Sequence, residues 1–79
     1  MLIKLESYRH ETRCLRLLRV TKTKIVTRSA AGDQSWNRKT GYFIPYVPFY
    51  TWHVSKESLD LVDSLYGNEG ELLTDDQDN

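Results

Sequence analysis

The chain has 79 residues, which is enough for one small domain and too few for a large, dry active-site cleft. Hydrophobic residues make up 39% of the sequence and charged residues 28%, so the apolar material suffices for a single core. The eleven basic and eleven acidic residues give a formal net charge of zero. The only cysteine is Cys14, which excludes an intramolecular disulfide and is typical of a reducing compartment.

The zero net charge results from two oppositely charged parts of the chain. Residues 1–56 carry all eleven basic residues and three acidic ones, for a net charge of +8, whereas residues 57–79 carry eight acidic residues and no basic one. Lys4 and Glu6 interrupt the N-terminal apolar residues, so we expect no signal peptide. No apolar stretch approaches the roughly 20 residues of a membrane helix. We therefore expect a soluble cytoplasmic protein.

The first half of the chain predicts antiparallel strands. Residues 1–12 favour an opening strand over a short helix. Residues 14–29 are rich in β-branched side chains and alternate basic residues with apolar ones or Thr, which predicts two strands with a turn near Thr21–Thr23. Gly32, which can adopt positive φ, marks a second turn that also includes Asp33.

A strand over residues 34–37 and a tight turn over residues 38–41 are expected next, with Gly41 in the left-handed conformation. Residues 42–50 contain Pro45 and Pro48, which cannot donate hydrogen bonds to a sheet. This segment is therefore an edge strand, a bulged strand or a loop, and pairing can resume at residues 52–54.

The C-terminal part predicts one helix and a tail. Ser55 is suited to the N-cap, Glu57 to the first turn, and Gly67 to the stop signal. Between them, apolar residues recur at helical spacing and predict an amphipathic helix over residues 56–66. Residues 68–79 are acidic and poor in core-forming residues, which predicts a disordered tail. Residues 1–67 would form the single domain.

No residue set in the sequence matches a catalytic or metal site. His10, His53 and Cys14 are the only histidines and cysteine, and none has a partner at metal-ligand spacing. We expect Cys14 to act as a small packing residue. The glycines form no phosphate-binding motif. We therefore expect no enzyme, no metal and no cofactor.

Large aromatic rings are concentrated in one segment of the chain. They are Trp36, Tyr42, Phe43, Tyr46, Phe49, Tyr50 and Trp52. Most of them are expected in the core, because a short chain needs bulky residues to bury enough area. Those that stay exposed beside the prolines would be rigid anchors for a partner. With two acidic residues of the predicted helix, the candidate partner-binding residues are Tyr46, Phe49, Tyr50, Trp52, Asp60 and Asp63.

The basic residues of the strands and turns have two interpretations. They can form an ordinary solvated sheet face, or a surface that binds the phosphates of nucleic acid. The candidates for the second role are Arg16, Lys22, Lys24, Arg28, Arg38 and Lys39, which we expect to face solvent. The tethered acidic tail would compete for these bases and weaken nucleic-acid binding at low salt.

Two short segments carry a resemblance to a known family. Val20-Thr-Lys-Thr-Lys-Ile-Val26 is followed, after a turn, by Ser35-Trp-Asn-Arg-Lys-Thr-Gly41 and later by Trp52. This arrangement resembles small SH3-like β-barrel proteins of bacteriophages. The resemblance implies a phage accessory role in the cytoplasm of the host cell, without identifying any binding residue. The chain departs from the family pattern at residues 42–52 and in its acidic tail.

Together these features predict a mainly β (α+β) fold, a small SH3-like antiparallel barrel or sheet with one C-terminal helix and an acidic tail. The leading hypothesis is a non-enzymatic regulatory or inhibitory protein that binds a host protein, one that itself handles nucleic acid. In this hypothesis the acidic helix and tail occupy a site normally used by a polyanion. The alternative is direct DNA or RNA binding through the basic strands. The sequence also leaves open a homodimer formed through an edge strand or the helix.

Overall fold

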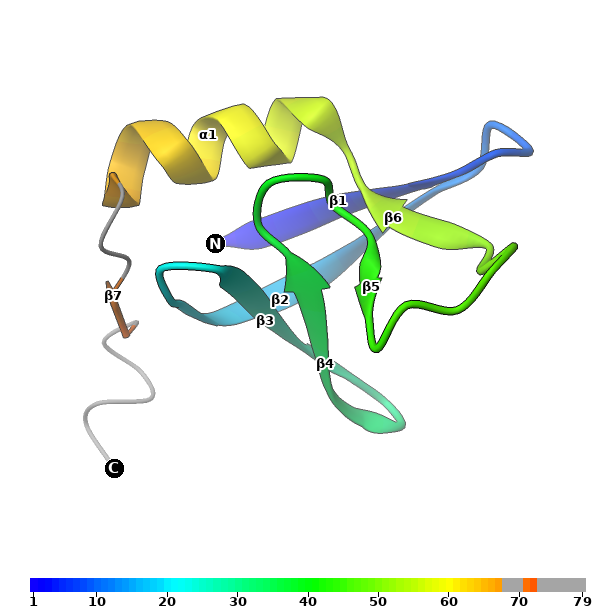
Figure 1. Ribbon diagram of the computed structural model, residues 1–79, viewed down its shortest axis with the longest axis horizontal. Coiled ribbons are helices and arrows are strands. Elements are labelled where there is room, and N and C mark those ends of the chain that lie inside the picture. Colours follow the sequence, from blue (N-terminus) through cyan, green and yellow to red (C-terminus); the bar gives the residue numbers. More distant parts are fainter. Residues whose placement is uncertain (68–70, 73–79) are drawn as a thin grey trace.

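The computed structural model describes residues 1–67 and 71–72, which form one antiparallel sheet and one helix (Figure 1). The elements in chain order are β1 Leu2–Ser7, β2 Thr12–Val20, β3 Lys24–Ser29, β4 Gly32–Asn37, β5 Phe43–Ile44, β6 Trp52–Val54, α1 Lys56–Tyr66 and β7 Glu71–Leu72. Hydrogen bonds join the strands in the order β5-β4-β3-β2-β1-β6, and β7 pairs separately with β2. The predicted mainly β fold with one C-terminal helix is confirmed.

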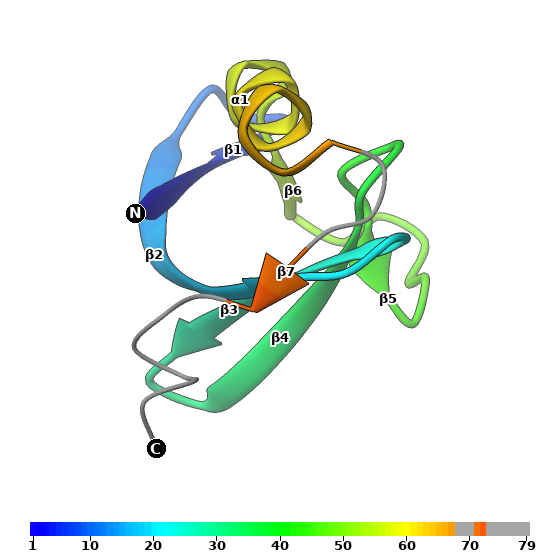
Figure 2. The same cartoon turned by 90° about the vertical axis from the view of Figure 1, so that its left-hand side faces the viewer.

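The sheet is strongly curled but is not a closed barrel. Figure 2 shows the curl, with α1 seen end-on at its open side. The terminal strands of the path are β5 and β6, and no strand pairing joins them within the part of the chain that the structure describes. A single backbone hydrogen bond, from Val54 N–H to the Gly41 carbonyl at 2.9 Å, connects the two ends. The expected sheet is therefore present without barrel closure.

The core lies inside the curl and is closed by the helix. Side chains of a strand alternate between its two faces, so the register places Ile3 of β1 opposite Leu15 of β2, and Ile25 of β3 opposite Trp36 of β4, on the inner face. Val62 of α1 is fully buried against them. The residues of this cluster are Ile3, Leu5, Leu17, Val20, Ile25, Trp36, Val54 and Val62.

The turns of the structure lie at the residues for which the sequence predicted them. At the turn between β2 and β3, the Thr21 hydroxyl accepts a hydrogen bond from Lys24 N–H at 2.9 Å. At the next turn Gly32 has φ 118° and already belongs to β4, so this strand begins two residues earlier than predicted. The early start follows from the pairing of Gly32 with Ser29 across the hairpin.

Gly41 is required by both conformation and space. Its φ is 83°, in the left-handed region, as predicted. A Cβ atom at this position would lie 2.7 Å from the Val54 carbonyl oxygen, which is too close for any side chain. The turn before it is held by the Asn37 side chain, whose Oδ1 accepts hydrogen bonds from the N–H groups of Lys39 and Thr40. The absence of a side chain at Gly41 thus allows the backbone before β5 to lie in close contact with the backbone of β6.

The predicted helix over residues 56–66 is confirmed as α1. Ser55 caps it by accepting a hydrogen bond from Ser58 N–H at 3.1 Å, and Gly67 follows its last residue with φ 60°. Its buried apolar side is narrower than predicted, because Leu65 is 59% exposed while Val62 is fully buried. No helix among the described residues is long and apolar enough to cross a membrane.

Two expectations differ from the structure. Cys14 is exposed, so the prediction that it packs in the core is wrong: it stands opposite Lys4 on the outer face of the sheet. The acidic segment 68–79 was expected to lack structure, yet Glu71–Leu72 form β7 and pair with Val20 and Arg19 of β2. The pairing follows from the length of β2, which extends beyond the part covered by β1. Residues 68–70 and 73–79 lie outside the described residues.

Candidate functional site

Half of the aromatic segment belongs to the core. We call residues 42–52 the aromatic loop. Within it, the rings of Phe43 and Tyr50 are stacked, with centroids 4.5 Å apart and planes inclined by 11°. The Trp36 ring packs against both, at 5.3 Å from Phe43 and 6.3 Å from Tyr50. Tyr50 was expected to be a candidate anchor, but most of its ring contributes to fixing the loop on the sheet.

The other half of the loop presents its side chains to solvent. Phe49 is 93% exposed and Tyr46 is 68% exposed, as expected for partner anchors. Tyr42 and Val47 are exposed as well, and the rings of Tyr42 and Tyr46 lie 6.2 Å apart. Four apolar or aromatic side chains thus form one exposed surface. Tyr42 and Val47 were not among the predicted partner-binding residues, although their places on either side of Pro45 and Tyr46 were a usable signal.

Phe49 occupies an unusual backbone conformation. Tyr50 N–H donates a hydrogen bond to the Val47 carbonyl at 3.1 Å, which closes a turn over residues 47–50. Pro48 is the second residue of the turn, and Phe49 is the third with φ 62°, the features of a type II turn. That third position favours glycine, because a side chain there costs about 1–2 kcal/mol. A large apolar ring at a strained and exposed position contributes little to folding.

Trp52 is partly covered by a cation. The guanidinium carbon of Arg13 lies 4.8 Å from the centroid of the Trp52 ring, within the range of a cation–π interaction. Trp52 also packs against the core cluster and is half-buried. As a candidate partner-binding residue, Trp52 is therefore less available than Phe49, which is 93% exposed.

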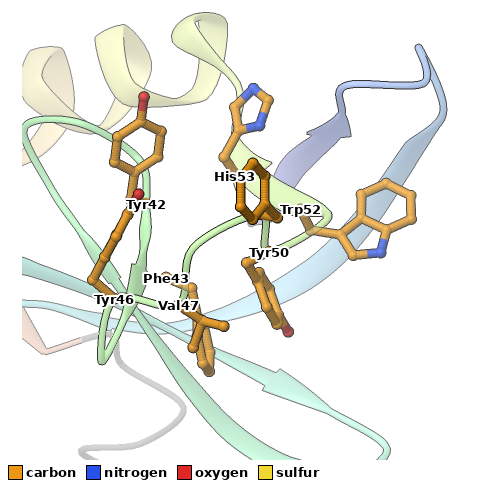
Figure 3. Close-up of a pocket in the computed structure, with 8 residues that line it drawn as sticks. Tyr42, Phe43, Tyr46, Val47, Tyr50, Trp52 and His53 are labelled. Carbon is orange, nitrogen blue, oxygen red and sulfur yellow. The ribbon is translucent and has the colours of Figure 1, made fainter.

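The exposed part of the loop borders a hollow of about 180 Å³. Figure 3 shows Tyr42 and Tyr46 on one side of this hollow and Tyr50, Trp52 and His53 on the other. A second hollow of about 670 Å³ shares Tyr42, Tyr50 and His53 with the first and extends along α1. The two hollows form a continuous surface between the aromatic loop and the helix.

Arg38 does not face solvent, so its assignment to an exposed phosphate-binding surface is corrected. Its side chain is 6% exposed. Nη1 donates to the Thr21 carbonyl at 2.9 Å, and Nε donates to Asp63 Oδ1 at 3.3 Å. These two hydrogen bonds offset part of the cost of burying the guanidinium, and they connect the β2–β3 turn to α1.

The acidic residues of α1 are paired with bases. Lys56 and Asp60 form an i,i+4 ion pair at 3.1 Å, and Asp63 binds Arg38. A third carboxylate, that of Glu57, lies 3.8 Å from Lys4 Nζ. Asp60 and Asp63 are exposed, as a partner-binding role requires, but their charge is largely balanced. The described part of the helix therefore resembles a polyanion less than its sequence indicates, because its carboxylates are paired with bases.

The remaining basic candidates fall into two groups. Arg16 and Arg28 stand directly opposite each other on β2 and β3, with Arg28 lying 3.8 Å from Asp33, and Lys24 projects further along β3. Lys22 and Lys39 are exposed and line, with Arg38, a third hollow of about 340 Å³. Three of the six candidates therefore line one hollow, whereas Arg16 and Arg28 face each other across β2 and β3.

The described residues offer no metal site, because no group of three or more His, Cys, Asp and Glu side chains comes together in residues 1–67 and 71–72. His10 lies in the β1–β2 turn and His53 in β6. No family model, curated protein or solved structure matches this chain. Function must therefore be argued from the geometry of the aromatic loop and its surroundings.

Proposed function

We propose that this chain is a non-enzymatic, phage-type regulatory or inhibitory protein that binds a host protein through its aromatic loop. The host protein would be one that handles nucleic acid, and the curled sheet would serve as an open variant of the SH3-like barrel that the resemblance implies. Phe49 and Tyr46 are the anchors, and the acidic residues of α1 and of the C-terminal segment contribute charge complementarity.

One observation carries the proposal: the ring of Phe49 is 93% exposed on a residue with φ 62°. Glycine would relieve the strain, and a polar residue would avoid the exposed apolar surface. Strained residues of this kind persist at sites of recognition when the surrounding structure fixes them. Here Pro48 and the Phe43–Tyr50 stack fix the loop, so little conformational entropy is lost when a partner covers Phe49.

The proposal predicts opposite effects of Phe49→Gly on binding and stability. Loss of an anchor ring should weaken capture of the host partner by about thirtyfold or more, because central anchors contribute about 2 kcal/mol or more. The free energy of unfolding should stay the same or rise by up to about 1 kcal/mol, because the strain is relieved. Affinity capture from host lysate and chemical denaturation measure the two effects.

Leu2→Ala is the matched control, because Leu2 is also apolar and 62% exposed but lies on β1, away from the loop. It should leave capture unchanged. The proposal is wrong if Phe49→Gly captures the same partner as strongly as the unmodified chain, or if the unmodified chain recovers no stoichiometric partner.

A second candidate function is direct nucleic-acid binding. Arg16 and Arg28 are cross-strand neighbours on β2 and β3, so two guanidinium groups lie on the same outer face of the sheet. A phosphate backbone across the outer face of β2 and β3 would contact both of them. Binding of this kind would show steep salt dependence and would strengthen when residues 68–79 are removed.

A further inference from the structure

We infer that the hollow formed by Lys22, Arg38 and Lys39 is an anion-binding site, and that it receives a carboxylate of the protein partner. The inference rests on the proposed function for the identity of the partner. The site lies beside the β2–β3 turn and has a volume of about 340 Å³. Its remaining lining residues are Thr23, Asn37 and Asp63.

The floor of the site is a buried guanidinium with an available donor. Arg38 uses Nη1 for the Thr21 carbonyl and Nε for Asp63, which leaves Nη2 without a partner among the described residues. No enclosed side-chain nitrogen or oxygen of the described residues lacks a hydrogen bond, so Nη2 keeps some access to solvent, and Arg38 lines the hollow. A donor of this kind, fixed in place and largely shielded from solvent, favours an anionic acceptor.

The rim of the site adds two positive charges. Lys22 and Lys39 are exposed, and neither ammonium has an ion-pair partner in residues 1–67. Asp63 neutralises one charge of the three, which leaves a net charge of about +2 around the hollow at neutral pH. The backbone of Lys39 is fixed in the turn, since its N–H donates to Asn37 Oδ1 at 2.8 Å.

The surface next to this site favours a polypeptide over a nucleic acid. The 670 Å³ hollow shares Arg38, Lys39 and Asp63 with the anion site and leads from it to the aromatic loop. Its lining carries three basic and three acidic side chains, so a phosphate backbone following it would meet Glu6, Asp60 and Asp63. An extended peptide can instead place a carboxylate between Lys22 and Lys39 and an apolar side chain against Tyr42.

NMR titration of the full chain with glutarate, a small dicarboxylate, tests the site directly. We expect saturable shifts of the Arg38 Nε–H signal and of the backbone amides of Lys22, Thr23 and Lys39. The paired substitution Lys22→Gln and Lys39→Gln should weaken glutarate binding about tenfold, because two charge-assisted contacts are lost. Arg9→Gln with Arg28→Gln removes the same charge elsewhere and should leave the affinity within about twofold.

The result that overturns the site is an absence of saturable shifts at these four residues, or equal weakening by both charge-removing pairs. A short oligothymidylate is the second probe: if it binds more tightly than glutarate and shifts both the site and the aromatic loop, the ligand is nucleic acid and the peptide assignment is wrong. If glutarate does not bind, the anion site is wrong, but the proposed function, which is tested by Phe49-dependent capture, still stands. If glutarate binds but capture does not depend on Phe49, the anion site stands and the proposed function is wrong.

Discussion

The indole of Trp36 is buried in the core, where its single polar atom needs a partner. Its Nε1 donates to Thr27 Oγ1 at 2.9 Å, and Thr27 is itself fully buried on the neighbouring strand. The two residues come from adjacent strands, where Thr27 pairs with Gln34 and Trp36 with Ile25. The buried hydroxyl of Thr27 thus accepts the hydrogen bond that the indole N–H of Trp36 donates.

Thr27→Val should therefore destabilise the protein although it nearly preserves volume. The substitution leaves the Trp36 N–H unsatisfied in the core, at a cost of about 1–3 kcal/mol. Chemical denaturation followed by Trp fluorescence measures the change. Thr27→Ser keeps the hydroxyl and loses one methyl, so it should cost less than Thr27→Val; the reverse order would contradict the assigned role of the hydrogen bond.

Neighbouring residues of one type can have opposite environments, and the sequence does not distinguish them. Arg38 and Lys39 were both predicted to face solvent, yet only Lys39 does. The difference arises because Arg38 N–H donates to the Thr23 carbonyl, which places the residue between the β2–β3 turn and α1. That placement depends on a helix 25 residues further along the chain, so no local pattern could reveal it.

At the scale of elements, α1 is joined to the sheet by hydrogen bonds at its first turn. Ser55 N–H donates to the Lys4 carbonyl at 2.9 Å, and the Ser58 hydroxyl accepts a hydrogen bond from Lys4 N–H at 2.9 Å. The first turn of the helix therefore hydrogen-bonds to Lys4 of β1, next to the pair that Leu5 forms with the last residue of β6. This contact positions Val62 over the core.

Ser58→Ala should loosen this junction. It leaves the Lys4 N–H without its acceptor at a position where Ser58 itself is 5% exposed, and we expect a loss of about 1–2 kcal/mol in the free energy of unfolding. Ser64→Ala is the control on the same helix: Ser64 is exposed, so the higher helix propensity of Ala should leave stability equal or slightly raised. Equal effects of the two substitutions would show that the hydroxyl contact is unimportant.

The aromatic loop shows what residue type alone can predict about an element. Two prolines predicted an edge strand or loop, and β5 is indeed the last strand of the path. Which rings are buried was not predictable from residue type, because Phe43 packs on the core while Phe49 is 93% exposed. Burial follows from the pairing of Phe43 with Trp36 across β4 and β5, which brings Tyr50 onto the same cluster and leaves Phe49 at the tip of the turn.

For the whole molecule, the segregation of charge gives a test that separates the two candidate functions. Ending the chain at Gly67 removes five acidic residues and no basic one. Every residue of the core cluster lies between Ile3 and Val62, so the shortened chain should still fold cooperatively. Loss of the two residue pairs between β7 and β2 should cost no more than about 2 kcal/mol.

The binding behaviour of the shortened chain is the informative measurement. In the proposed function, Phe49-dependent capture of the host protein persists, and gel shifts with DNA or RNA stay weak at low salt. In the second candidate function, the shortened chain binds nucleic acid more tightly than the full chain and loses this binding steeply as salt rises. Tight, salt-dependent binding together with loss of host-protein capture would reverse the order of the two candidates.

The sequence alone determined the helix, its caps and most of the strands and turns, because these depend on residues close together in the chain; it predicted neither β7 nor the extent of β5. Gly41, Ser55 and Gly67 specified their local conformations without reference to the rest of the fold. The tertiary structure decided the burial of Arg38, the exposure of Phe49 and the incomplete closure of the sheet. These depend on contacts between segments far apart in the sequence, which form only when the sheet curls and the helix packs on it.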